Sequence, residues 1–171
     1  MALIDAMVIE LQQEALRTAR VLEEIGDRHL TWRPRAGART VGQQALQVAT
    51  LPAAIAQLVA VPTPAPAQAE PASAAALVPA LTQSVSIAQQ VLSGMDDAAL
   101  LASWRLVYSQ REVFSIPRGA LLRSLMLDHW RQQRAELAFY LRSVGAGNGT
   151  AAFTGDVANP FAVAEPSGSI G

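Results

Sequence analysis

Four segments of this 171-residue chain repeat apolar residues at the three- and four-residue spacing of an amphipathic helix. These segments are residues 3–25, 40–59, 74–93 and 118–144. In the last of them the stripe consists of Leu122, Met126, His129, Gln133, Leu137, Tyr140 and Val144. A lone helix cannot bury its own stripe, so the four helices must pack against one another. The sequence therefore predicts an all-α fold, an antiparallel four-helix bundle.

The joins between these helices differ in character. Thr40 and Gln43 have the spacing of a capping box, which marks the start of the second helix. Residues 61–72 are rich in proline and alanine and predict a long, extended connection between the second and third helices. Residues 104–108 and 113–116 are β-prone, so we expect at most a tiny hairpin before the last helix.

The composition limits the classes of function. Cysteine is absent and all thirteen basic residues are arginine, which excludes cysteine or lysine nucleophiles and thiolate metal sites. The formal net charge of −1 predicts no nucleic-acid-binding face. No stretch offers the ~20 apolar residues that a membrane span needs, and no secretory signal is recognisable, so we expect a cytoplasmic protein. We expect one bundle domain over residues 1–145 and an irregular tail over residues 146–171.

Charge is distributed unevenly among the four helices. The first helix carries Glu10 and Glu14 on its polar face, and the arginines of the last helix are expected to pair with such acids on a solvated face. Between Arg39 and Asp96, by contrast, Glu70 is the only charged residue. Surfaces depleted of charge are typical of subunit interfaces, so we expect a homodimer that forms through helices 2 and 3, the second and third of the four segments.

Two polar residues interrupt the apolar stripe of the last helix. His129 and Gln133 lie one turn apart, and Gln47 of the second helix is placed to approach them. A polar side chain that faces a core needs a partner, since an unpaired buried donor costs about 1–3 kcal/mol. Gln47, His129 and Gln133 are therefore the candidate pocket. We expect His129 to be a core histidine hydrogen-bonded to Gln133 or Gln47, and the alternative is that it is the candidate catalytic residue. The other histidine, His29, lies beside a loop and is expected to be exposed.

Two motifs give the chain a resemblance to a known family. The first combines a Trp-x-Pro run at residues 32–34 with a Thr-x-Gly run at residues 40–42, where a helix begins. The second runs from Leu127 to Leu137 and continues through Tyr140, Leu141, Arg142 and Gly145. Together they resemble the signature of the DinB-like family over residues 3–145.

The resemblance implies a four-helix bundle, commonly dimeric, related to thiol-dependent transferases and metal-dependent hydrolases. It also implies three histidines that hold a nickel or zinc ion. Those family positions fall on Gln47, His129 and Gln133, so one of three imidazoles is left. An amide oxygen is a poor ligand for metals that favour imidazole, and we therefore expect no metal and no other cofactor.

Three hypotheses of function follow. The first is a metal-free, catalytically degenerate protein that binds a small molecule or serves as a dimeric scaffold in a stress-related role. The second is a metal-dependent or thiol-dependent transferase or hydrolase that uses His129. The third is a module for protein–protein interaction through the uncharged second and third helices.

Overall fold

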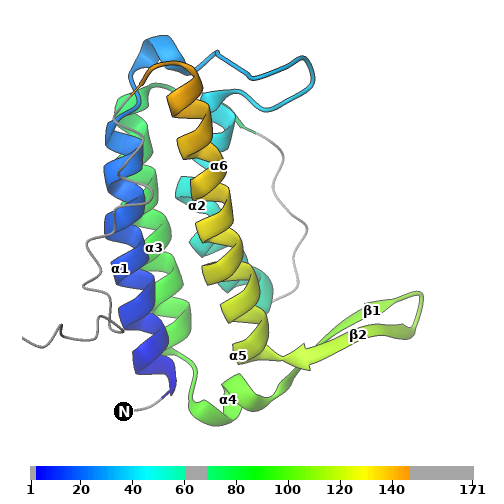
Figure 1. The fold of residues 1–171 in the computed structure, drawn as a ribbon. Coiled ribbons are helices and arrows are strands. Elements are labelled where there is room, and N and C mark those ends of the chain that lie inside the picture. Colours follow the sequence, from blue (N-terminus) through cyan, green and yellow to red (C-terminus); the bar gives the residue numbers. More distant parts are fainter. Residues whose placement is uncertain (1–2, 61–68, 147–171) are drawn as a thin grey trace, which may run out of the picture.

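A bundle of four long helices makes up most of the computed structural model, which describes residues 3–60 and 69–146 (Figure 1). The four helices are α1 (Leu3–Glu23), α2 (Val41–Ala60), α3 (Leu77–Ser93) and α6 (His129–Ser143). α3 packs on both α1 and α2, and α2 also packs on α6. The predicted all-α class and the four-helix bundle are confirmed.

α2 and α3 begin at the same end of the bundle. Two 3-10 turns lie at this end, Asp27–His29 after α1 and Ala74–Ala76 before α3. The backbone N–H of Ala74 donates to Oδ1 of Asp27 at 2.7 Å, which ties the start of α3 to the end of α1. α2 and α3 therefore run in the same direction, while α1 is antiparallel to α3 and α2 is antiparallel to α6 (Figure 1). The predicted long connection between α2 and α3 makes this direction possible.

The first turn of α2 is fixed by the Thr-x-Gly run. The N–H of Gln43 donates to Oγ1 of Thr40, and the N–H of Thr40 donates to Oε1 of Gln43, both at 3.0 Å. The predicted capping box is thus confirmed. The N–H of Gly42 donates to the Leu30 carbonyl at 2.9 Å, and a Cβ at position 42 would lie 3.1 Å from that oxygen. Position 42 favours glycine because the loop backbone approaches it so closely.

A β-hairpin precedes the last helix and projects away from the bundle (Figure 1). Its strands are β1 (Ser103–Tyr108) and β2 (Arg111–Pro117), which follow the short helix α4 (Asp97–Leu101). Near the base, Trp104 pairs with Ile116 and is buried against the core. Exposed apolar side chains farther out are Leu106, Val107, Val113 and Phe114. The small hairpin expected before the last helix is confirmed.

The last helix changes its winding along its length. α5 (Arg118–Leu121) leads into a π-helical segment (Leu122–Asp128), which leads directly into α6. A π turn holds more residues than an α turn, so the core-facing position moves along the sequence. Trp130 is fully buried, whereas His129, expected on the buried stripe, is half buried. The spacing predicts a buried His129 only if the whole helix has α-helical winding. The π-helical segment before His129 explains why Trp130 is buried more deeply than His129.

Two other expectations concern the limits of the bundle. In the described ranges 3–60 and 69–146, no helix is long and apolar enough to cross a membrane. Ala146 is buried at the end of the last helix. The rest of the predicted tail, residues 147–171, and residues 61–68 of the predicted connection lie outside the described residues.

Candidate functional site

A buried pair of amides links α2 to α6. Gln44 is fully buried, and its Nε2 donates to Oε1 of Gln133 at 3.0 Å. The same nitrogen donates to the main-chain carbonyl of Gln133 at 3.3 Å. Oε1 of Gln44 accepts from Nη1 of Arg39 at 3.4 Å. Both polar atoms of the Gln44 side chain thus have partners inside the chain, as buried polar groups require.

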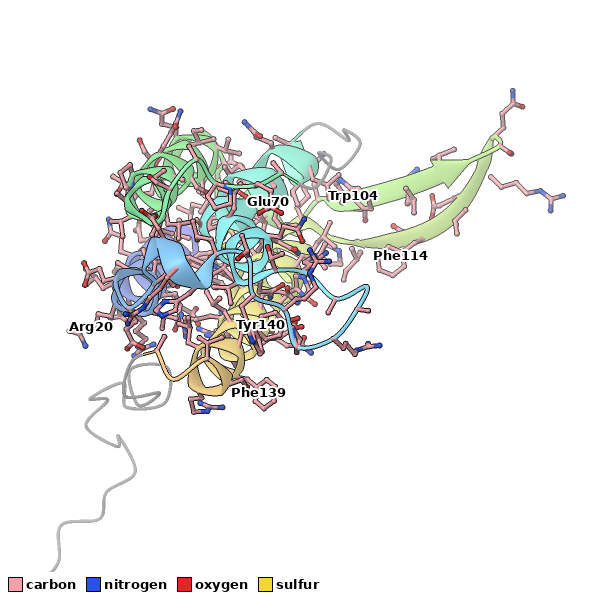
Figure 2. The ribbon with its side chains drawn as sticks, turned by 90° about the horizontal axis from the view of Figure 1, so that it is seen from above. Arg20, Glu70, Trp104, Phe114, Phe139 and Tyr140 are labelled. Atoms are coloured by element: carbon pink, nitrogen blue, oxygen red, sulfur yellow. The ribbon has the colours of Figure 1, made fainter. Side chains whose placement is uncertain are left out.

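The cluster extends along α6 toward the loop that joins α1 to α2. Glu136 accepts from Nε2 of Gln44 at 3.5 Å and from the hydroxyl of Tyr140 at 3.4 Å. Burial, together with the charge of Glu136, raises the pKa of Tyr140. The ring of Tyr140 meets Trp32 edge-on, with ring centroids 6.0 Å apart, and Figure 2 labels Tyr140 beside the last helix. The two motifs behind the resemblance therefore contact each other.

One of the three predicted pocket residues, Gln133, belongs to this cluster. Gln47 and His129 are half buried, and within residues 3–60 and 69–146 no hydrogen bond joins either side chain to Gln133. The structure instead pairs Gln133 with Gln44, which lies nearly one turn before Gln47. The pattern did not single out Gln44 because several glutamines share this uncharged run. Gln44 lies four residues before buried Val48, and this helical spacing is the signal in the sequence that places Gln44 on the buried face of α2.

The amide pair bears on whether a metal ion would fit here. Oε1 of Gln133, the atom that would have to bind the ion, already accepts the N–H of Gln44. An amide oxygen is also a poor ligand for zinc or nickel. Among the described residues, no group of three or more His, Cys, Asp or Glu side chains is placed to hold a metal ion. The side chains at Gln47, His129 and Gln133 do not fit the three-histidine centre that the resemblance implies.

A second polar cluster joins α1 to α6. Glu14 is 1% exposed and forms ion pairs with Nη1 of Arg134 at 2.7 Å and Nε of Arg131 at 3.2 Å. Nη1 of Arg134 also donates to Oγ1 of Thr18 at 3.2 Å. Burial acts to raise the pKa of Glu14, but the hydrogen bonds and charges of Arg134 and Arg131 outweigh it and hold the pKa below its usual value.

This cluster confirms one expectation and corrects another. Arginines of the last helix do pair with the acids of the first, as Arg123 does with Glu10 at 3.0 Å. The expected solvated face is wrong for Glu14 and Arg134, which are both buried. Glu14 and Arg134 are buried together as an ion pair between α1 and α6, which holds opposite charges away from water.

Of the comparisons with known proteins, the one with solved structures identifies the fold. No family model matches the chain, and neither does any curated protein sequence. A DinB-like protein from Bacillus cereus ATCC 10987 is similar in structure, with a TM-score of 0.64 and 18% identity over 80% of this chain and 89% of that chain. A DinB-like protein from Bacillus subtilis has a TM-score of 0.63 and 16% identity over 82% and 92%. At such identities the likeness concerns the fold, and the chain therefore has the fold of the DinB-like proteins.

Proposed function

We propose that this chain is a metal-free, catalytically degenerate DinB-like protein that acts by binding a small molecule or as a dimeric scaffold. The observation that supports this is the Gln44–Gln133 amide pair. Gln133 cannot turn its oxygen toward an ion without taking an acceptor from the buried Nε2 of Gln44. Nε2 of Gln44 would then keep only its longer contacts, to the Gln133 carbonyl at 3.3 Å and to Glu136 at 3.5 Å, so the pair opposes metal binding.

Restoring the missing histidines tests this proposal. The Gln47→His/Gln133→His variant keeps His129 and offers three imidazoles, and titration calorimetry with Zn²⁺ and Ni²⁺ should show a new site in it. The unaltered chain should show none. A matched control is Gln12→His/Gln57→His, which places two imidazoles on exposed positions of α1 and α2. One ion bound per unaltered chain, and lost in His129→Ala, would contradict the proposal.

A cytoplasmic location and a stress-related role are further parts of the proposal. Both rest on the sequence pattern and on the resemblance to the DinB-like family. Cell fractionation and the growth of a deletion strain under a panel of stresses test them. Recovery of the protein outside the cytoplasm, or unaltered growth under every stress applied, would count against the corresponding part.

Catalysis that uses His129 is a second candidate, a transferase or hydrolase. The observation that favours it is the π-helical segment Leu122–Asp128, which ends immediately before His129. Such turns are frequent at functional sites. Because the chain contains no cysteine, a reacting thiol would have to come from a small-molecule substrate. Turnover of an electrophile with a small thiol, lost in His129→Ala while the melting temperature stays unchanged, would establish this candidate.

We also propose a homodimer, with α3 offering the larger part of the interface. α2 lies largely buried between α3 and α6, which explains much of its lack of charge. The exposed residues of α3 are uncharged, among them Thr82, Gln83, Ser86, Gln90 and Ser93. This surface supports a subunit contact or a contact with another protein.

Sedimentation velocity at micromolar concentration tests the homodimer. The unaltered chain should sediment as a dimer, and Ser86→Arg on the exposed face of α3 should give monomers. Gln12→Arg on the exposed face of α1 is the matched control and should stay dimeric. A monomer for the unaltered chain would remove the proposal.

A further inference from the structure

A cavity of about 370 Å³ opens at the end of the bundle where α1 and α6 both end. Its lining residues are Arg28, His29, Trp32 and Val144. His29 is 8% exposed, so the expectation that it lies exposed beside the loop is wrong. The 3-10 turn after α1 folds its ring back, and Nδ1 accepts the N–H of Gly26 at 3.0 Å.

The hydrogen bond from Gly26 determines which nitrogen of His29 carries the proton. A neutral imidazole has one acceptor nitrogen and one N–H. Since Nδ1 is the acceptor, Nε2 must carry the hydrogen. Nε2 also lies 3.0 Å from Nε of Arg28, and a guanidinium has only N–H donors. In the arrangement shown, Nε of Arg28 donates to Nε2, but a neutral imidazole cannot accept at both of its nitrogens. The backbone N–H of Gly26 is fixed by the 3-10 turn, whereas the side chain of Arg28 is exposed, so Nδ1 is the acceptor and the guanidinium is the group that turns. This leaves Nε2–H of His29 and the guanidinium of Arg28 as two donors beside the cavity.

We propose that this cavity binds a small organic carboxylate that carries an aromatic or other apolar body. The carboxylate accepts from Nε2–H of His29 and from the guanidinium of Arg28, whose exposed side chain is free to turn toward the ligand. The apolar body lies against Trp32 and Val144, the other walls of the cavity. The inference rests on the proposed function, because it names the ligand of a binding protein.

A larger groove along α1 is less suited than this cavity to bind an anion. That groove, of about 500 Å³, is lined in part by Glu10, Glu14, Arg17 and Arg131. Its arginines already form ion pairs with its two glutamates, so an anion would have to displace a carboxylate. Arg28, in contrast, forms no ion pair with an acidic side chain among the described residues, and its charge is available to a ligand.

Phenylacetate is a suitable probe, because it combines a carboxylate with one aromatic ring. Titration into the ¹⁵N-labelled chain should give a saturable shift of the Trp32 indole N–H signal. Phenylacetamide has the same shape without the charge and should bind about tenfold more weakly or less. Equal binding of the two compounds, or no saturable shift with phenylacetate, would overturn the inference.

Two substitutions test whether phenylacetate binds in this cavity. Arg28→Gln removes the charge of an exposed side chain and should weaken phenylacetate binding about tenfold. Val144→Asp sets a carboxylate beside the ligand and should abolish binding. Arg20→Gln is the matched control, since Arg20 is an exposed arginine of α1 that points away from the bundle (Figure 2). Circular dichroism confirms that each variant folds, and unchanged affinity in Arg28→Gln would refute the assignment.

The metal content of the same sample separates this inference from the proposed function. If the chain contains no metal and does not bind phenylacetate, the carboxylate site is refuted and the proposed function still stands. A chain with one bound nickel or zinc ion would refute the proposed function, whatever the result with phenylacetate.

Discussion

Removing one amide of the Gln44–Gln133 pair should destabilise the protein, whereas removing both should cost less than the sum of the single losses. Methionine is the suitable replacement because it keeps the length of the side chain and has no N–H. Gln44→Met takes from Oε1 of Gln133 its donor at 3.0 Å. Gln133→Met still leaves Nε2 of Gln44 the carbonyl at 3.3 Å and Glu136 at 3.5 Å. The first substitution should therefore cost more.

The expected magnitudes follow from burial. A buried polar group without a partner costs about 1–3 kcal/mol. Gln44 is fully buried and Gln133 is 9% exposed, so we expect losses of about 2 kcal/mol for Gln44→Met and about 1 kcal/mol for Gln133→Met. The double variant leaves neither amide unpaired and should lose about 2 kcal/mol, which gives a coupling free energy of about 1 kcal/mol.

Urea unfolding followed by circular dichroism measures these free energies of unfolding. The control is Gln12→Met with Gln57→Met, two exposed positions whose small effects should add. If the losses of Gln44→Met and Gln133→Met add to within about 0.5 kcal/mol, the reasoning that the two amides satisfy each other is refuted.

Other parts of the bundle allow equally direct tests. Arg134→Met should lower the free energy of unfolding by about 3 kcal/mol in urea, because it removes one cation from buried Glu14; a loss under about 1 kcal/mol would contradict this. The folded pKa of Glu14 lies below its ordinary value of 4.5, so its contribution to stability should be present above that value and lost as pH falls through the folded pKa. Glu14→Gln should therefore reduce the loss of unfolding free energy as pH falls below about 4.5. An equally steep loss in this variant would refute the assignment of the effect to Glu14. Gly42→Ala should cost about 1–2 kcal/mol because of the nearby Leu30 carbonyl, whereas Gly94→Ala, with its nearest contact at 3.5 Å, should cost less; equal thermal stability of the two would count against the close approach.

The spacing of apolar residues was sufficient to predict the bundle, because burial in an all-α chain follows from that spacing. The capping box of Thr40 and Gln43 was equally predictable, since both of its hydrogen bonds are local. The face of the last helix was less predictable near His129. Spacing carries no information on the π-helical winding of Leu122–Asp128, and that winding turns Trp130 into the core.

The polar clusters were only partly predictable. The stripe of the last helix showed that Gln133 faces inward, but the choice of Gln44 over Gln47 depends on the way α2 is rotated against α6. Glu14 occupies the polar face of its helix, and its burial depends on the ion pairs that it forms with Arg131 and Arg134 of α6. Both features are products of tertiary packing, which the pattern of a single helix does not contain.

The central claim is that Gln133, one of the three positions at which the DinB-like resemblance implies a metal ligand, is held instead in a satisfied amide pair with Gln44. The most direct test is the number of nickel and zinc ions per chain, measured by elemental analysis of protein purified without chelators or a metal-binding tag. We predict well below one ion per chain. A value near one, which falls in His129→Ala, would contradict the claim and establish the region around His129 and Gln133 as a metal centre.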